Sequence, residues 1–459
     1  AFEELGFSRG DGNLGNDLTP HLLAMGGFPL ILEMEEDEKV LVPEYLELRG
    51  EVYVTRTEFR RQNKELEKRG EPSYATPRSL AAGSLQLGSP KETGRRGLQL
   101  VFFGFGAWDP GTSQPESQAA FLAQLKAWKV PLPSHILQRG NSVDLLEAAT
   151  RMTKTWEAAE IPTDGIVVKV NPLACQRRLG VGSSFPHWAV ACKFPGPSGV
   201  TRLSAIRFQV GRSGVLTPVG EIDPIELGGR TVARVSLHSA GYIRARDLRE
   251  GDWVRLELAG DTIPVLGPIL KERRGEGSLP FRIPGECPAC GEVLQDRDGR
   301  LSCPAPDCPE KQLKELLHFV RSVGIGQLGE ARLKALIEGS LINSPADFYL
   351  LHEHAGTVHQ ILGEGIGSKV LENIGKSRAA EPWQVLRGLG IPGIGTAGAR
   401  RMMGVFGSLA HLLESLSSGN GLQAWDLPEN MLLSLFNYYK SEGGKDSLVR
   451  LSEAMIKEP

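Results

Sequence analysis

The sequence lacks any apolar run long enough to cross a membrane, and it has few cysteines. Without such a run no membrane-spanning segment is expected, and nothing near the start resembles a secretory signal. Six cysteines in 459 residues are too few for a disulfide scaffold. We therefore expect a cytoplasmic protein with no membrane partner.

An excess of charge of one sign is also missing. Lys and Arg total 52 against 55 Asp and Glu, so the net charge is −3 and any basic surface must be local. The length exceeds what one hydrophobic core serves, so several domains are expected. The sequence starts at Ala1 in mid-pattern, and we expect further residues upstream of it.

Two apolar runs that each carry one lysine organise the chain. Residues 166–170 follow an Asp-Gly turn signal and contain Lys169 as their only charge, and residues 188–194 contain Lys193. The first run is so rich in β-branched residues that it predicts a strand buried on both faces, and the second predicts another apolar strand. A buried ammonium is costly unless an anion meets it, so the pair suggests a cleft for a phosphate-bearing ligand. The alternative is that each lysine snorkels from a strand end to solvent.

Other candidate polar residues precede this pair. Residues 9–17 form a glycine-rich turn that begins with Arg9, a composition also typical of an ordinary loop. Glu51 lies among apolar neighbours in a predicted strand at 46–54, where it could accept from a ribose hydroxyl or hold a divalent metal. The alternative for Glu51 is a cross-strand salt bridge with an arginine.

Arg78 stands alone before a helix of small residues predicted near 80–85. The aromatic strand at 101–106 offers rings that could stack on a base, although core packing explains them as well. After Pro195, short alternating strands with turn glycines predict a compact β-barrel such as an OB-fold. Arg212, in one of its loops, could reach a phosphate.

Four cysteines share one short region. Their spacing is C-x2-C-x12-C-x4-C, and the residues are Cys287, Cys290, Cys303 and Cys308. Two close thiolate pairs joined by a loop can close a tetrahedral Zn²⁺ site with no ligand position left open, so the site should be structural. The other two, Cys175 and Cys192, lie in apolar company and are expected to be inert.

The region beyond Gln312 is predicted to be helical with a repeated small-residue turn between helices. The turns are Gln327-Leu328-Gly329, Gly365-Ile366-Gly367 and Gly393-Ile394-Gly395. Such hairpins let backbone N–H groups at a helix start approach a DNA phosphate. Binding through them should be independent of base sequence and sensitive to salt.

These motifs, in this order, resemble those of the bacterial NAD-dependent DNA ligases over nearly the whole chain. The matching segments are 9–12, 48–52, 164–169, 188–194, 209–214, the four cysteines and the hairpins. The resemblance implies a multidomain α+β protein. Its expected parts are a fragment of an ATP-grasp-like nucleotidyltransferase (adenylation) domain at 1–197, an OB-fold at 198–282, a zinc finger at 283–311 and a helix-hairpin-helix domain at 312–459.

The resemblance also implies the chemistry. A lysine attacks NAD, AMP passes from that lysine to the 5′-phosphate of a nick, and the 3′-hydroxyl displaces it, with Mg²⁺ meeting the developing charge. By resemblance Lys169 and Lys193 face the phosphates, Arg9 and Glu51 contact the adenylate, and Arg78 lies near the reacting phosphate. The expected cofactors are NAD, Mg²⁺ and Zn²⁺. The expected protein is a monomer that acts on nicked duplex DNA in replication and repair.

The sequence departs from the family in several places. It contains no Lys-x-Asp-Gly segment, which carries the family's nucleophile and should precede the first residues here, and no segment that resembles a BRCT domain. Thr76, Ser79, Pro162 and Leu258 replace two asparagines, a glutamate and a basic residue, and Gln327 replaces a glycine. A non-catalytic DNA-binding relative with a decayed pocket is therefore the alternative. A repair nuclease is disfavoured because no clustered carboxylates are present.

Overall fold

The chain separates into two compact units. In the computed structural model, residues 5–10, 15–26, 43–132, 140–156, 159–182, 185–260, 263–418, 427–441 and 443–455 are described. The first unit comprises 1–204, 221–235 and 251–275, and the second comprises 205–220, 236–250 and 276–459. No helix among the described residues has the length and apolar composition needed to cross a bilayer.

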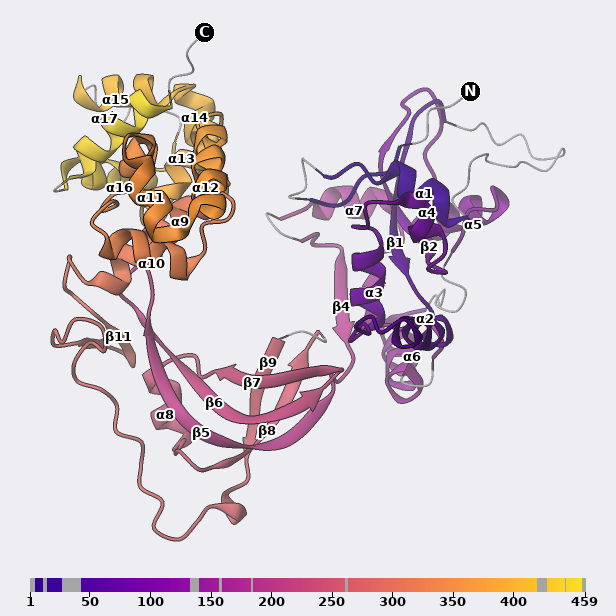
Figure 1. Ribbon diagram of the computed structural model, residues 1–459. Coiled ribbons are helices and arrows are strands. Elements are labelled where there is room, and N and C mark those ends of the chain that lie inside the picture. The colour runs from indigo at the N-terminus through magenta and orange to yellow at the C-terminus, as the bar shows by residue number, and fades with distance from the viewer. Residues whose placement is uncertain are drawn as a thin grey trace. The chain divides into compact units, whose positions relative to one another are not determined.

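Helices and short strand pairs alternate in the N-terminal part of the first unit (Figure 1). The elements are α1 (Thr19–Met25), β1 (Leu46–Tyr53), α2 (Arg56–Lys68), α3 (Pro77–Ser84), α4 (Pro90–Gly94), β2 (Gln99–Trp108), α5 (Gln118–Ala127), α6 (Ser142–Thr155), β3 (Gly165–Lys169), α7 (Leu173–Leu179) and β4 (Ala189–Lys193). β1 pairs with β2 and β3 pairs with β4, both antiparallel.

Aromatic packing fixes the position of β2. Phe102 and Trp108 on this strand are buried with Phe121 and Trp128, which lie on α5 and at its C-terminal cap. The rings of Trp108 and Trp128 stack with centroids 6.3 Å apart. Phe103, the residue after Phe102, lies on the exposed side of the strand. Core packing therefore explains Phe102, whereas the ring of Phe103 faces outward.

Two of the family departures have a structural explanation at the start of α3. The Thr76 Oγ1 accepts from the Ser79 N–H at 3.1 Å, and the Ser79 Oγ accepts from the Thr76 N–H at 3.0 Å. This reciprocal capping box satisfies two backbone donors that would otherwise lack partners. Thr76 and Ser79 therefore keep the helix start that presents Arg78.

A five-stranded sheet follows, with the strand order β7-β6-β5-β8-β9 (Figure 1). Its strands are β5 (Ser198–Val210), β6 (Leu216–Leu227), β7 (Arg230–Ser236), β8 (Trp253–Ala259) and β9 (Ile263–Ile269), and α8 (Ala240–Arg246) lies between β7 and β8 in sequence. Buried and exposed residues alternate along β6 and β8, as the sequence predicts. Leu258 is almost fully buried, so the residue that replaces a basic side chain serves the core.

The second unit contains a small two-stranded ribbon and a bundle of helices (Figure 1). The ribbon is β10 (Gln295–Arg297) with β11 (Arg300–Ser302). The α-helices are α9 (Pro309–Val323), α10 (Glu330–Glu338), α11 (Ala355–Leu362), α12 (Glu364–Ser377), α13 (Pro382–Gly388), α14 (Thr396–Phe406), α15 (Leu409–Ser417), α16 (Glu429–Lys440) and α17 (Gly444–Ala454). One apolar cluster runs through them, with Phe319 and Phe348 stacked 5.9 Å apart.

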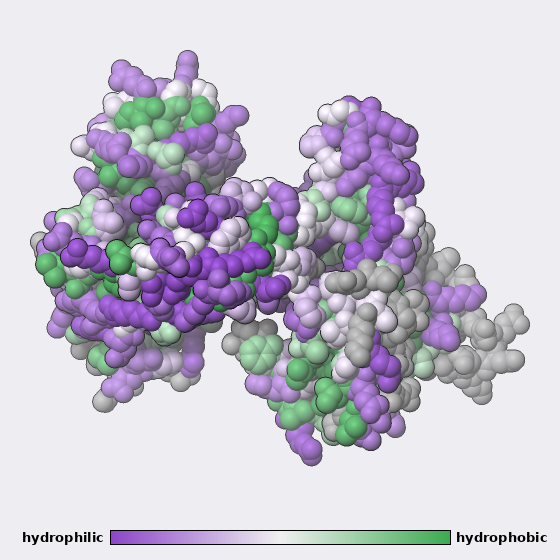
Figure 2. All heavy atoms as spheres, turned by 90° about the horizontal axis from the view of Figure 1, so that it is seen from below, coloured by the Kyte–Doolittle hydropathy of each residue, from purple (hydrophilic) through white to green (hydrophobic). Residues whose placement is uncertain are grey.

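Hydrophilic residues cover most of the face drawn in Figure 2, and apolar residues form separate patches on it.

A buried ion pair connects the segment after β9 to the start of β8. The Arg274 guanidinium donates to both oxygens of Asp252, at 2.8 and 2.9 Å, and the two side chains are 13% and 1% exposed. Two parallel hydrogen bonds make this contact directional as well as electrostatic.

We predict that Asp252→Ala destabilises the first unit by about 3 kcal/mol or more, because it leaves a buried guanidinium without its carboxylate. Glu65→Ala is the matched control: Glu65 forms an exposed pair with Arg69, and its loss should cost under about 1 kcal/mol. Urea denaturation followed by circular dichroism measures both. Equal unfolding midpoints for the two variants would contradict the assignment.

Candidate functional site

Lys169 and Lys193 lie on the same face of the β3–β4 pair. In the antiparallel register Gly165 is opposite Lys193, and Lys169 is opposite Ala189. Opposed residues share a face, and so do residues separated by an even number along a strand. Both ammonium groups therefore project to one side from positions four residues apart, which is about 13 Å along the ribbon.

The prediction that the strand carrying Lys169 is buried on both faces is wrong for the described residues. Val167, on the face that carries the lysines, is 56% exposed, and Val190, on the other face, is 69% exposed. The physical reason is that β3 and β4 pair only with each other in the described part of the chain. A two-stranded ribbon cannot cover its own faces.

Lys169 reaches across to the β1–β2 pair. Its Nζ donates to the Phe103 carbonyl oxygen at 3.0 Å and lies 5.3 Å from the centroid of the Phe103 ring. Burial lowers the pKa of Lys169 from its usual range. Because the ammonium is bonded to the Phe103 carbonyl, it does not simply snorkel to bulk water. Within the described residues no carboxylate pairs with it.

Lys193 has a different environment. Its Nζ contacts the Asp164 Oδ2 at 2.6 Å, and the side chain is 57% exposed. This lysine matches the alternative of a strand-end ammonium in contact with solvent. Asp164 comes from the Asp-Gly turn at the start of β3, and the sequence predicted no contact between its carboxylate and a lysine. The site therefore contains one cation balanced by a carboxylate and one that is not.

Glu51 is exposed on β1, opposite Val101 of β2. The cross-strand salt bridge considered for it does not form within the described chain, where Arg49 pairs with Glu47 at 3.1 Å instead. Val101 is two residues from Phe103 along β2. Glu51 therefore belongs to the strand pair that Lys169 contacts, and its carboxylate remains available.

Neither Arg78 nor Arg9 contacts the lysines or Glu51 in the described part of the chain. Arg78 is exposed in the first turn of α3, and Arg9 is exposed beside a bridge between Phe7 and Asp17. Residues 11–14 of the same glycine-rich turn lie outside the described residues. Phe103, whose carbonyl also accepts from the Gln118 amide, was missed as a lysine partner, because a backbone acceptor leaves no signal in a sequence.

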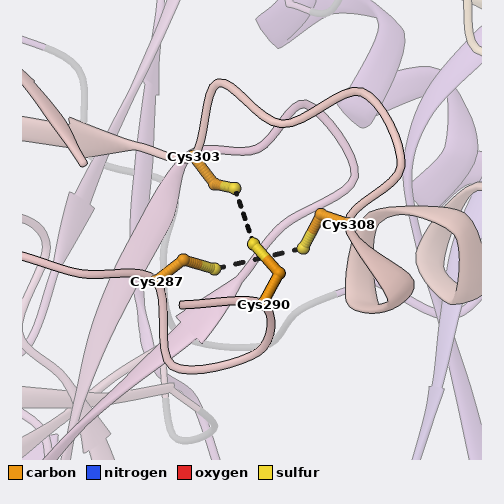
Figure 3. A group of neighbouring side chains, drawn as sticks. All are labelled: Cys287, Cys290, Cys303 and Cys308. Carbon is orange, nitrogen blue, oxygen red and sulfur yellow. Dashed lines mark hydrogen bonds between the residues drawn. The ribbon is translucent and has the colours of Figure 1, made fainter. Parts of the chain in front are cut away.

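The four cysteines converge as their spacing predicts (Figure 3). All four sulfur atoms lie within 4.8 Å of one another, with 4.0 Å between Cys287 and Cys308 and 3.5 Å between Cys290 and Cys303. Tetrahedral Zn–S bonds of about 2.3 Å place sulfurs about 3.8 Å apart. The donor set therefore fits Zn²⁺ with all four positions filled by protein.

The thiols respond differently to this crowding. Burial raises the pKa of Cys303 to about 12. Burial also opposes ionisation of Cys287, but hydrogen bonds from the backbone N–H groups of Ala289 and Cys290 outweigh it and lower the pKa of Cys287. A bound dication would favour the thiolate form of all four. Outside this cluster Cys192 is exposed, so its expected apolar surroundings are not found.

Backbone contacts anchor the cysteine cluster to the β5–β6 hairpin and to α8. The Cys303 N–H donates to the Gly214 carbonyl at 2.9 Å, and Val215 bridges to Ser302. On the other side the Gly241 N–H donates to the Gly299 carbonyl at 3.0 Å, and Arg244 pairs with Asp296 at 2.8 Å. The cluster shares a core with Val210 and Leu216 of that hairpin.

The predicted hairpin turns differ from one another. Gly329 and Gly395 are the N-cap residues of α10 and α14, as a phosphate-binding helix start requires. Gly365 and Gly367 instead lie within the first turn of α12. A Cβ at Gly367 would collide with His359, so its backbone is covered by α11 rather than open to a ligand. Gly363, with φ +81°, makes that connection in a single residue.

Arg212 lies in the β5–β6 hairpin, but its guanidinium is not directed to open solvent. Its Nη1 is buried, and a Cβ at Gly390, between α13 and α14, would collide with it. The structure thus places Arg212 against the helical bundle.

Comparison with known proteins identifies close relatives of this chain. Residues 4–197 match the family model of the NAD-dependent DNA ligase adenylation domain, and residues 200–278 match that of the NAD-dependent DNA ligase OB-fold domain. DNA ligase 1 of Opitutus terrae is 35% identical over 456 residues, which cover 97% of this chain and 67% of the relative. The DNA ligase of Geobacter sulfurreducens is 33% identical, with 99% and 67% covered. That of a Synechococcus strain is 38% identical, with 88% and 59% covered.

We predict that Cys303→Ser lowers zinc content from one ion per chain to nearly none and loosens the β5–β6 hairpin, because much of the stability of a small zinc module is metal binding. The α9–α17 bundle should stay folded on its own apolar core. Elemental analysis and amide hydrogen exchange near Gly214 measure the two effects.

Cys192→Ser is the matched control, because that thiol is exposed and lies outside the cluster. It should retain the zinc. A wild-type chain without zinc, or a Cys303→Ser chain with normal exchange near Gly214, would contradict the prediction.

Proposed function

This chain belongs to the family of NAD-dependent DNA ligases, and from that premise we propose that it carries the adenylate-facing and DNA-binding parts of an enzyme that seals nicks in duplex DNA. It spans about two thirds of the length of its first two relatives. The observation that carries the proposal is the pair of lysines on one face of the β3–β4 ribbon, one of them without a carboxylate partner in the described chain.

The proposed task of the two lysines is to meet phosphate charge. A half-buried ammonium without a counter-ion is stabilised when an anion approaches, so Lys169 favours a phosphate at the junction of the two strand pairs. Lys193 pairs with Asp164 and supplies a second positive charge on the same face. Preorganised charges of this kind stabilise a phosphoryl group in transfer without reorganisation.

The remaining roles are proposals of the same kind. Glu51 and Arg9 would contact the adenylate and Arg78 would lie near the reacting phosphate. NAD would supply the adenylyl group, and Mg²⁺ would neutralise the phosphates during transfer. No lysine in the chain stands in a Lys-x-Asp-Gly context, and the Nζ of Lys193 is already paired with Asp164.

We further propose that the helical bundle at 312–459 is a helix-hairpin-helix domain that holds the DNA backbone. In support, Gly329 and Gly395 cap helices whose first N–H groups have no intrahelical acceptor. The zinc module at 283–311 would fix the bundle's first helix, since α9 begins directly after Cys308. The proposed nucleotidyltransferase domain at 1–197 would have the ATP-grasp-like arrangement that the resemblance implies.

The second candidate function is a DNA-binding relative without catalysis. The exposed faces of the β3–β4 ribbon favour it, because a nucleotide cleft needs walls that exclude water. Lys169, Lys193 and Glu51 argue against a decayed pocket.

Adenylyl transfer distinguishes the two functions. We predict that the 459-residue chain forms no covalent AMP adduct, whereas a longer chain that includes an upstream Lys-x-Asp-Gly segment forms one with NAD and not with ATP. In the longer chain, Lys169→Ala or Lys193→Ala should each slow adduct formation by roughly two orders of magnitude, the effect of removing one preorganised charge. Incubation with adenylate-labelled NAD or ATP, followed by denaturing electrophoresis, measures this.

A labelled band from the 459-residue chain would show that one of its own lysines is the nucleophile. A longer chain that is folded but never labelled would support the non-catalytic relative.

The hairpin proposal predicts a loss of DNA affinity in Gly395→Val. Gly395 has φ −85° and open space around its Cβ position, so valine fits the fold but shields the α14 N-terminus. Affinity for nicked duplex should fall about tenfold, because hydrogen bonds to a charged phosphate are lost. Gly404→Val, at an equally open site farther along the same helix, is the control and should bind normally.

Titration with fluorescent duplexes of several sequences measures the effect. The loss should be equal for all of them, and a loss confined to one sequence would show that the turn reads bases instead.

A further inference from the structure

The backbone of the β5–β6 hairpin is fixed at both ends. The Gly211 N–H donates to the Val215 carbonyl at 2.8 Å, and the Gly214 N–H donates to the Gly211 carbonyl at 2.9 Å. Gly214 has φ +79°, which a residue with a side chain rarely adopts. Its carbonyl accepts from Cys303, so the cysteine module holds the tip of the hairpin. The starting point of the Arg212 side chain is therefore well defined.

The Arg212 guanidinium packs against the backbone of Gly390. A Cβ built on Gly390 would be 3.0 Å from Cζ and 3.3 Å from Cδ, and it would collide with Nη1. No hydrogen-bond partner for this buried Nη1 exists among the described residues. The contact thus depends on shape, because a Cβ at position 390 would displace the guanidinium.

Charges on α9 face the same guanidinium. Burial raises the pKa of Glu315, while Lys311 and Arg212 act in the opposite direction. The His318 Nε2 lies 2.9 Å from the Arg387 carbonyl, and burial together with Arg212 and other cations lowers the pKa of His318. Arg212 therefore lies beside both α9 and the end of α13.

Gly390 is directly linked to the turn that the proposed function assigns to DNA. Its N–H donates to the Arg387 carbonyl at 3.0 Å, and Gly393 follows three residues later. Ile391 and Ile394, on either side of Gly393, are buried, and the Ile394 N–H donates to the Ile391 carbonyl at 3.0 Å. Gly390 and the turn at 393–395 are therefore joined by one short segment whose apolar side chains are packed in the core of the bundle.

We propose that Arg212 is a positioning residue: it holds the α13–α14 connection against the β5–β6 hairpin before DNA binds, and so presents the turn at 393–395. The proposal rests on the DNA-binding role assigned to that turn above. It replaces the expectation that Arg212 itself contacts a phosphate. The two roles differ in whether Arg212 matters when no DNA is present.

A double-mutant cycle tests the contact in the DNA-free chain. Gly390→Ala introduces both backbone strain, because φ is +67°, and the collision with Arg212. In the Arg212→Ala background only the strain remains. The double variant should therefore lose less stability, measured from unfolding midpoints, than the sum of the losses of the two single variants. Gly407→Ala is the matched control: φ is +72° there, with nothing near its Cβ position, and its effect should add to that of Arg212→Ala.

Hydrogen exchange and salt titration complete the test, with Arg212→Gln as a second variant in case the alanine variant does not fold. Without DNA, exchange of the amides at 394–396 should quicken about two- to 150-fold, the fold-change that corresponds to the range of coupling energies between contacting residues. Ser213→Ala, at the exposed neighbour, should leave it unchanged. With nicked duplex, affinity should fall while the slope of log affinity against log salt stays the same.

Additive damage in the cycle, unchanged exchange without DNA, and a salt slope smaller by about 0.9 would overturn the proposal and assign Arg212 to a phosphate. The cycle and the exchange measurement contain no DNA. They therefore succeed or fail independently of the ligase function, which the adenylyl-transfer assay tests.

Discussion

The convergence of four thiol groups is the constraint on which the second unit depends. The ribbon between the cysteine pairs consists of two three-residue strands, too small to bury a core of its own. It is held instead by the cysteine cluster and by docking on the β5–β6 hairpin and α8. Because α9 starts at the residue after Cys308, the same cluster sets where the helical bundle begins.

That arrangement gives the β5–β6 hairpin two neighbours. Gly214 at its tip is bonded to Cys303, and Arg212 beside it reaches Gly390. The four-cysteine module therefore holds the hairpin tip through Cys303 and leads directly into α9 after Cys308.

In the first unit, the two lysines of the β3–β4 pair have different partners. Lys193 has Asp164 as its counter-ion, whereas Lys169 has a carbonyl oxygen and an aromatic ring. The neutral partners hold the Lys169 side chain in place without cancelling its charge. The junction of the two strand pairs therefore holds an oriented cation that has no carboxylate partner among the described residues.

The sequence alone determined what depends on local chemistry: the lysine-bearing strands, the spacing of the four cysteines, and the helix starts at Gly329 and Gly395. Strand periodicity, ligand spacing and capping act over a few residues, so they are visible in the chain itself. Only the tertiary structure showed that Lys169 is bonded to the Phe103 carbonyl, that His359 lies against Gly367, and that Arg212 contacts Gly390. These contacts join residues distant in sequence and depend on backbone atoms or on the absence of a side chain, which leave no periodic signal to be recognised.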